Sequence, residues 1–177
     1  MAHRGLTGVL LVGGASRRFG SAKALARFGG TTLAERAWAV LGEACDERLA
    51  FGKAADALDL PFPVLDDDVE LRAPIVGVVA GLRAGRHDIC VFLPVDCPLL
   101  TPAALCELGT ACADAAVPAT GPLPGAYSMR ALPVLERRLE AGELSLRGAL
   151  AELDTTVVPL DRALLANVNA PEELAAL

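Results

Sequence analysis

The stretch Gly8-Val9-Leu10-Leu11-Val12-Gly13-Gly14 leads into a polar and basic segment that runs to Lys23. A short apolar run of this kind is typical of a strand buried on both faces of a parallel sheet. The glycines let backbone N–H groups approach a ligand closely, while Arg17, Arg18 and Lys23 supply positive charge. The segment therefore predicts a cradle for a polyphosphate, the alternative being a solvated basic turn. It matches neither a P-loop nor a dinucleotide-binding fingerprint.

Outward from this stretch, short strands alternate with helices. We expect further strands at residues 48–51, 62–65, 88–93 and 155–160. We expect helices at residues 32–45, 74–83, 133–140, 146–153 and 171–177, and one after Thr101-Pro102 that carries Leu105 and Leu108. This alternation predicts an α/β fold with three layers and a mostly parallel central sheet. Ligands of such sheets bind outside the carboxyl ends of the strands.

Length and composition narrow the class of protein. A chain of 177 residues predicts a single domain. The net charge of −6 argues against a nucleic-acid partner, and the longest apolar run, Ala73–Leu82, is too short to span a membrane. The five cysteines form no CxxC pair, so we interpret them as buried structural thiols in a reducing cytoplasm. His3 and His87 are too few for a histidine metal site.

Two acidic positions lie where strands are expected to end. Asp96 follows an apolar strand and has prolines on both sides, in Leu93-Pro94-Val95-Asp96-Cys97-Pro98. A carboxylate fixed in this way suits Mg²⁺, which prefers one or two carboxylates together with substrate phosphates and water. Asp66-Asp67-Asp68 is the second candidate. The alternatives are a turn aspartate at residue 96 and an exposed acidic turn at residues 66–68.

In their order and spacing, these motifs resemble those of the molybdenum cofactor nucleotidyltransferases, and most closely the guanylyltransferase branch. The family pattern L-x-G-G-x-S-x-R-x-G-x-x-K is matched by Leu11, Gly13, Gly14, Ser16, Arg18, Gly20 and Lys23. Further matches are Asp66 with Ala73-Pro74-Ile75-Val76-Gly77, Asp96-Cys97-Pro98, Pro122–Tyr127, and Asn167-Val168-Asn169-Ala170-Pro171-Glu172-Glu173-Leu174. The resemblance covers residues 8–174.

The resemblance implies a Rossmann-like nucleotidyltransferase that joins GMP from GTP to the terminal phosphate of molybdopterin and releases pyrophosphate. Residues 1–100 would mainly bind the nucleotide, and residues 101–177 would form the acceptor side. The implied nucleotide contacts are Leu11, Val12, Gly13, Gly14, Lys23, Asp66 and Asp96. Asp96 would also bind Mg²⁺, Asn167 and Asn169 would lie on the acceptor side, and Arg18, Lys23 and Asp96 would be catalytic. GTP and molybdopterin would be the partners, with transient contact to proteins that insert or chaperone the cofactor.

The sequence departs from the family in three places. Val12 stands where alanine is usual, which predicts less space near the base. The second strand ends in Ala50-Phe51-Gly52-Lys53, without the asparagine that relatives often carry, and the segment after Pro118 is short. Three alternatives stay open: a cytidylyltransferase that uses CTP on the same cofactor, a nucleotidyltransferase with another acceptor, and a nucleotide-binding accessory protein without turnover. The Gly13-Gly14 pair favours the guanine enzyme.

Overall fold

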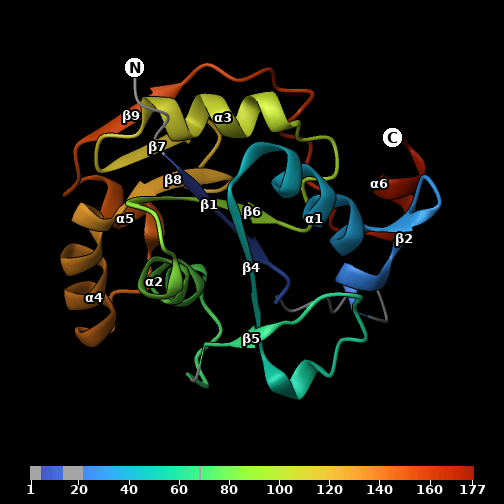
Figure 1. The fold of residues 1–177 in the computed structure, drawn as a ribbon, viewed down its shortest axis with the longest axis horizontal. Helices are drawn as coiled ribbons and strands as arrows, with labels where there is room; N and C mark the ends of the chain where they lie inside the picture. Colours follow the sequence, from blue (N-terminus) through green and yellow to red (C-terminus); the bar gives the residue numbers. More distant parts are fainter. Residues whose placement is uncertain (1–4, 14–21, 68) are drawn as a thin grey trace.

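A computed structural model describes residues 5–13, 22–67 and 69–177. Its centre is a seven-stranded sheet with the order β5-β4-β1-β6-β8-β7-β9 (Figure 1). The strands are β1 (Leu6–Leu11), β4 (Glu47–Gly52), β5 (Leu65–Asp66), β6 (Ile89–Pro94), β7 (Ala115–Pro118), β8 (Gly125–Ser128) and β9 (Thr155–Val158). Strand β8 is antiparallel to β6 and β7, whereas the other pairings described in this sheet are parallel. The predicted mostly parallel sheet is confirmed.

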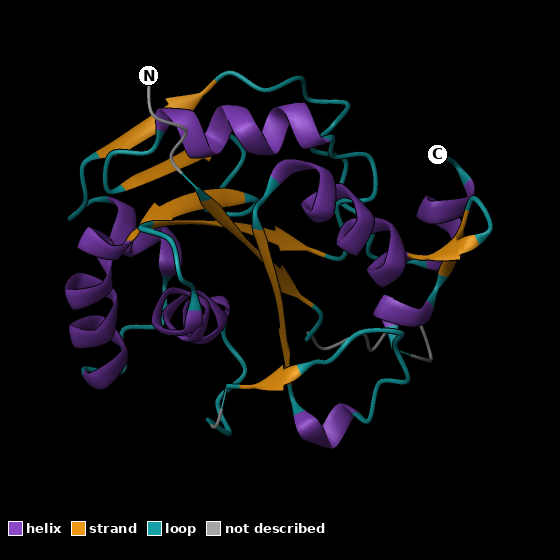
Figure 2. Cartoon of the chain, in the orientation of Figure 1, coloured by secondary structure: helices purple, strands orange, loops and turns teal. Residues whose placement is uncertain are grey.

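Helices cover both faces of the sheet, which gives the three predicted layers (Figure 2). Helices α1 (Leu33–Ala44) and α3 (Pro102–Ala111) pack on one face. Helices α2 (Pro74–Ala84), α4 (Leu132–Glu140) and α5 (Leu146–Leu150) pack on the other. The remaining elements are η1 (Lys23–Leu25), the antiparallel pair β2 (Arg27–Phe28) and β3 (Thr31–Thr32), η2 (Ala54–Asp56), η3 (Met129–Ala131) and α6 (Pro171–Ala175).

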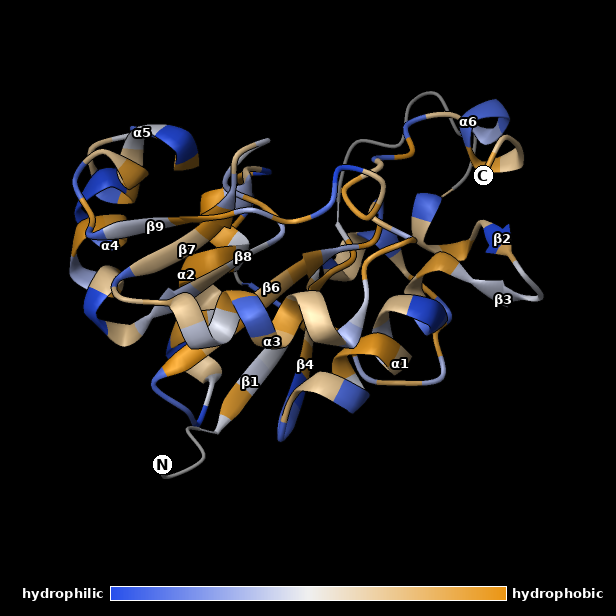
Figure 3. Ribbon diagram, turned by 90° about the horizontal axis from the view of Figure 1, so that it is seen from above, coloured by the Kyte–Doolittle hydropathy of each residue, from blue (hydrophilic) through white to orange (hydrophobic). Residues whose placement is uncertain are grey.

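The hydrophobic core is divided by the sheet into two clusters. Val9 and Leu10 are neighbours in β1, and both are fully buried, but they belong to opposite clusters. Successive side chains of a strand point to opposite faces, so a strand covered on both sides is apolar at every position. Figure 3 shows this as hydrophobic colour along β6, in contrast to the largely hydrophilic colour of α6.

Two local signals fix the helices that flank the site. The Thr32 hydroxyl accepts from the Glu35 N–H while the Glu35 carboxylate accepts from the Thr32 N–H, which is the capping box expected at the start of α1. Helix α2 begins at Pro74 and lies very close to β1. A Cβ built at Gly77 would lie 2.8 Å from Leu11 Cδ2, so glycine permits this approach.

Two expected elements differ from the structure in their bounds, and the sequence did not predict β8. The strand expected at residues 62–65 is only Leu65–Asp66, because Phe62 is drawn into the core and stacks on Trp38 with ring centroids 4.2 Å apart. Strand β8 was not predicted, because Gly125–Ser128 directly follows a turn sequence and has no apolar run of its own. The helix expected at residues 146–153 ends at Leu150.

Within the described part of the chain, no helix combines the length and the apolar composition that crossing a bilayer requires.

Candidate active site

A cavity of about 420 Å³ opens at the carboxyl ends of β4, β1 and β6. This volume lies within the range of small-molecule sites. The side of the cavity at β6 and the C-terminal segment is lined by Pro94, Asp96, Cys97, Leu123 and Asn167. The side at β4 and α2 is lined by Phe51, Gly52, Lys53, Asp67, Leu71, Arg72, Ala73, Pro74 and Gly77, with Leu11 and Gly13 between the two sides. The cavity thus lies at the sheet edge that the sequence predicts.

A polar cluster forms one end of this region. Lys23 Nζ lies 3.5 Å from Asp96 Oδ2 and 3.3 Å from Asn169 Oδ1. The Lys23 and Asp96 side chains are 15% and 24% exposed, so both are partly shielded and still reachable. Three residues from distant parts of the chain therefore meet within reach of one ligand. A cation, a carboxylate and an amide together suit a phosphate with its counterion.

Backbone contacts hold this cluster in place. The Val95 N–H donates to Leu11 O at 3.3 Å, and the Val168 N–H donates to Asp96 O at 2.9 Å. Val168 is buried, whereas Asn167 and Asn169 on either side of it are exposed. Asn167 consequently lines the cavity while Asn169 reaches Lys23. The Arg36 Nε of α1 also donates to Pro98 O at 2.6 Å, which ties α1 to the loop after β6.

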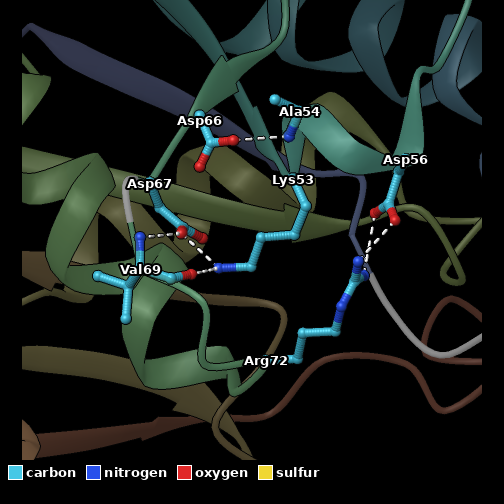
Figure 4. Close-up of polar contacts among 7 residues, drawn as sticks. All are labelled: Lys53, Ala54, Asp56, Asp66, Asp67, Val69 and Arg72. Atoms are coloured by element: carbon cyan, nitrogen blue, oxygen red, sulfur yellow. Dashed lines mark hydrogen bonds and ion pairs between the residues drawn. The ribbon is translucent and has the colours of Figure 1, made fainter.

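An ion pair occupies the opposite wall, where β4 and β5 end. The Lys53 ammonium donates to Asp67 Oδ1 and to Val69 O (Figure 4). The Val69 N–H also donates to Asp67 Oδ1, at 3.2 Å. The Lys53 and Asp67 side chains are 11% and 8% exposed, although both line the cavity. This wall therefore presents a rigid carboxylate with a cation beside it.

A second ion pair borders the same wall. The Arg72 guanidinium binds the Asp56 carboxylate through two hydrogen bonds of 3.0 and 2.7 Å (Figure 4). This contact joins η2 to the start of α2 and fixes Arg72 at the cavity. The Asp56 side chain raises the pKa of Arg72 through its hydrogen bonds and its charge. A bidentate arginine–carboxylate pair also fixes the orientation of both groups.

The predicted site residues lie as follows. Leu11, Gly13, Asp96 and Asn167 line the cavity, and Lys23 and Asn169 contact each other beside it. Gly14 and Arg18 lie outside the described residues. The roles assigned to all these residues stay predictions.

Val12 and Asp66 lie elsewhere than the cavity lining. The Val12 side chain is buried in the core cluster beside α1, and its Cγ2 lies against Gly52. The Val12 side chain thus points into the core and is not part of the cavity lining, and the expected narrowing near the base stays a prediction. Asp66 is exposed, and its Oδ2 accepts from the Ala54 N–H at 2.6 Å. Nucleotide contacts by Val12 and by Asp66 stay predictions.

The residues present fit a magnesium ion that the substrate helps to bind. Within the described residues, no group of three or more His, Cys, Asp or Glu side chains is placed to hold a metal. Asp96 Oδ2 and Asn169 Oδ1 nevertheless both lie within 3.5 Å of the Lys23 ammonium. Two oxygen atoms that could bind a metal are therefore close together. Mg²⁺ commonly completes such a partial set with water and substrate phosphates.

Cys97 lies beside Asp96 and also lines the cavity. Burial raises the pKa of its thiol to about 12, helped by the negative charge of Asp96. The thiol is consequently neutral near pH 7, and it contacts Asp96 Oδ1 at 3.7 Å.

Sequence reasoning missed the wall made by Lys53, Asp67 and Arg72. The acidic run at residues 66–68 was noticed, but alternation along a strand sends adjacent side chains to opposite faces. The sequence did not show which carboxylate faces inward, because that depends on the register of β5 against β4. Lys53 carried a signal, because it ends the segment Ala50–Lys53, where the sequence departs from the family pattern.

Comparison with known proteins places this geometry in a family. Residues 8–157 match the family described as the MobA-like NTP transferase domain. A probable molybdenum cofactor guanylyltransferase of Chloroflexus aggregans is 33% identical over 97% of this chain and 93% of its own length. A protein of the same name from Opitutus terrae is 37% identical over 95% of this chain and 92% of its own length.

Solved structures are also similar to this protein. Molybdopterin-guanine dinucleotide biosynthesis protein A from Archaeoglobus fulgidus superposes with a TM-score of 0.81 and 25% identity, over 96% of this chain and 95% of that one. A 4-diphosphocytidyl-2C-methyl-D-erythritol synthase from Anaerococcus prevotii reaches a TM-score of 0.74 at 11% identity, over 98% of this chain and 94% of that one, and shows the shared fold alone. The chain therefore belongs to the MobA-like NTP transferase family and is a nucleotidyltransferase of molybdenum cofactor biosynthesis.

Proposed function

We propose that this protein transfers GMP from GTP to the terminal phosphate of molybdopterin, with Mg²⁺, and releases pyrophosphate. The observation that carries the proposal is the meeting of Lys23, Asp96 and Asn169 at the carboxyl edge of the sheet, beside a cavity large enough for a small ligand. The guanylyltransferase names of the relatives support GTP and molybdopterin as the substrates.

The reaction is a substitution at phosphorus. An oxygen of the acceptor phosphate attacks the α-phosphorus of GTP, the bond from that phosphorus to the bridging oxygen breaks, and pyrophosphate leaves. The attacking oxygen is already ionised near pH 7, so no strong general base is required. Positioning and charge neutralisation then provide most of the catalysis.

The residues at the cavity would have different roles in this reaction. Lys23 neutralises the phosphates of GTP, and Asp96 with Asn169 would hold Mg²⁺ at the same end of the cavity. Bound Mg²⁺ supplies additional positive charge for the oxygens of the transferred phosphate. Asn167 faces the cavity from the C-terminal segment, which supports a role on the acceptor side.

The test is pyrophosphate release from GTP and molybdopterin, measured with and without Mg²⁺. We expect Asp96→Asn to lower the rate by about 10²–10³, the loss typical of removing one preorganised charge-stabilising contact. Asp88→Asn is the matched control, because this exposed carboxylate precedes the amino end of the same strand, β6.

Two results would contradict the proposal. Full activity of Asp96→Asn would remove the metal assignment. A wild-type protein that binds GTP but releases no pyrophosphate with the acceptor would instead be a nucleotide-binding accessory protein.

A further inference from the structure

We propose that the Cys97 thiol is a positioning group that holds the Asp96 carboxylate in the orientation needed to bind Mg²⁺. This role rests on the proposed function, because it concerns the same carboxylate. It also adds a residue to which the family resemblance assigns no role. Three features of the structure support it: the partner of the thiol, the second partner of the carboxylate, and the place of the thiol between the core and the cavity.

The Cys97 thiol donates to a carboxylate, unlike the three other thiols that contact oxygen atoms. Cys97 Sγ lies 3.7 Å from Asp96 Oδ1. The thiols of Cys90, Cys106 and Cys112 instead contact main-chain carbonyl oxygens, at 3.8, 3.7 and 4.0 Å. A thiol is a weak donor, and a charged acceptor strengthens its hydrogen bond. Of these four contacts, only that of Cys97 acts on a side chain proposed to bind a metal.

The two oxygens of the Asp96 carboxylate have different partners. Oδ1 accepts from the Cys97 thiol, whereas Oδ2 lies 3.5 Å from the Lys23 ammonium. The χ2 angle of an aspartate is only broadly restricted, so the plane of the carboxylate is set by partners of this kind. Mg²⁺ demands near-ideal octahedral geometry. The orientation of this plane therefore affects how well Asp96 can bind the ion.

We expect one of these two partners to leave when the nucleotide binds. Lys23 is proposed to turn to the phosphates of GTP, which frees Asp96 Oδ2 for the metal. Cys97 is held in place by its main chain, because its N–H donates to Pro94 O at 3.4 Å and its carbonyl accepts from the Leu100 N–H at 3.3 Å. The thiol is therefore the partner that the carboxylate keeps, and it would fix the plane while Oδ2 binds Mg²⁺.

Cys97 lies at the boundary between the hydrophobic core and the cavity. The residue is 6% exposed and belongs to the core cluster beside α1 and α3, yet it lines the cavity next to Asp96. Removing a hydrogen-bond partner of a metal ligand typically weakens metal binding by about 10–100-fold. Serine at this position would keep a donor, whereas alanine would remove it. The two substitutions therefore distinguish a positioning role from simple packing.

The experiment measures the dissociation constant of GTP by calorimetry, once with Mg²⁺ and once with a chelator. No acceptor is added, so the measurement does not depend on turnover. The ratio of the two constants gives the contribution of the metal to GTP binding. We expect Cys97→Ala to reduce this ratio by about 10-fold. The constant measured without Mg²⁺ should stay within about twofold of the wild-type value, because the thiol acts through Asp96 and not on the nucleotide.

Further variants separate the hydrogen bond from packing. Cys97→Ser should keep the ratio within about threefold of the wild-type value, because its hydroxyl also donates. Cys112→Ala is the matched control, since Cys112 is 7% exposed, belongs to the same core cluster and lies outside the cavity lining. It should leave both constants within about twofold. Asp96→Asn should bring the ratio close to one. If Cys97→Ala does not fold, Cys97→Val replaces it, because valine fills the site without a donor.

The outcomes separate the role of Cys97 from the proposed function. A wild-type ratio in Cys97→Ala, together with a ratio near one in Asp96→Asn, would overturn the role of Cys97 alone. Equal reductions in Cys97→Ala and Cys97→Ser would also overturn it, because packing and not the hydrogen bond would then support the metal. A ratio of one in the wild-type protein would overturn the Mg²⁺ assignment, and absence of GTP binding would overturn the proposed function as a whole.

Discussion

At the scale of single residues, we expect the positive charge of Lys23 to contribute most to binding the nucleotide. It lies between Asp96 and Asn169 at the edge of the cavity. We expect Lys23→Ala to weaken GTP binding by about 10–100-fold, because a hydrogen bond to a charged group contributes about 1.5–3 kcal/mol. Calorimetric titration of GTP measures this.

The control for Lys23→Ala is Arg162→Ala, which removes one positive charge from an exposed position outside the cavity lining. Equal affinities of Lys23→Ala and the wild-type protein would show that Lys23 only neutralises Asp96 and does not touch the nucleotide.

The interpretation of all five cysteines as buried thiols is wrong for Cys106, which lies on the exposed side of α3. Burial raises the pKa of Cys45 and of Cys90 to about 12, whereas Cys106 is exposed. The thiolate is the reactive form, so at pH 8 we expect Ellman's reagent to label Cys106 rapidly and Cys45 and Cys90 only after denaturation. The rapid phase should disappear in Cys106→Ser while turnover is retained.

A rapid phase that persists in Cys106→Ser would show that a buried thiol opens to solvent. Lost turnover in a stably folded Cys106→Ser protein would show that this cysteine is more than structural.

At the scale of elements, a polar network holds together the end of the sheet that is remote from the cavity. The Glu47 carboxylate, on β4, accepts from the Thr7 hydroxyl of β1 at 2.7 Å. It also accepts from the Arg86 N–H at 2.8 Å and the Arg86 Nε at 2.7 Å, just before β6. One side chain thereby connects three neighbouring strands, while their carboxyl ends are free to bind ligand.

This network predicts a pH dependence. Burial raises the pKa of Glu47, but the hydrogen bonds from Arg86 and Thr7 outweigh it, so the net pKa is lowered from 4.5. A lowered pKa in the folded state stabilises the fold above the unfolded pKa, and this contribution is lost as the pH falls. We expect Glu47→Gln to reduce the free energy of unfolding by about 1–3 kcal/mol at pH 7. The difference from the wild-type protein should shrink below about pH 4.5.

Urea denaturation at a series of pH values measures this difference. Glu140→Gln, an exposed carboxylate at the end of α4, is the control and should change stability by less than about 0.5 kcal/mol. If Glu47→Gln lowers the free energy of unfolding by the same amount from pH 7 to pH 4, the packing of the Glu47 side chain, and not its charge, accounts for its role.

At the scale of the whole molecule, ligand binding should stabilise the entire fold. The proposed nucleotide site draws residues from β1, β6, the segment after β4 and the C-terminal segment, so bound GTP connects distant parts of the chain. At about 100 times its dissociation constant, a ligand stabilises by about 2.7 kcal/mol, which for this size raises the melting temperature by about 5–10 °C. GTP with Mg²⁺ should produce the largest shift among GTP, CTP, ATP and UTP.

The nucleotide panel also distinguishes the alternatives. A shift selective for CTP would indicate the cytidylyltransferase. The absence of a shift with each of the four nucleotides would remove the main support for a phosphate cradle after β1.

The sequence by itself determined the layers of this protein and predicted the residues that meet at the β6 end of its cavity. The apolar runs of β1 and β6 are buried on both faces, and that requirement is readable without coordinates. Asp96 was found because a carboxylate between prolines after a buried strand is a local pattern. The Asn-x-Asn spacing around buried Val168 is local in the same sense, since alternation exposes both amides.

Only the tertiary structure decided which side chains form the opposite wall. Whether Asp66 or Asp67 faces the cavity follows from the pairing of β5 with β4, and a shift of one residue would exchange them. Val12 points into the core because Gly52 leaves room for it there, which is a contact between the residue after β1 and the end of β4. The antiparallel β8 likewise depends on its pairing with β6 and β7 and not on its own four residues. Local chemical patterns can be recognised from residues that are neighbours in the sequence. The direction of these side chains and the pairing of β8 depend instead on contacts between segments that are distant in the chain.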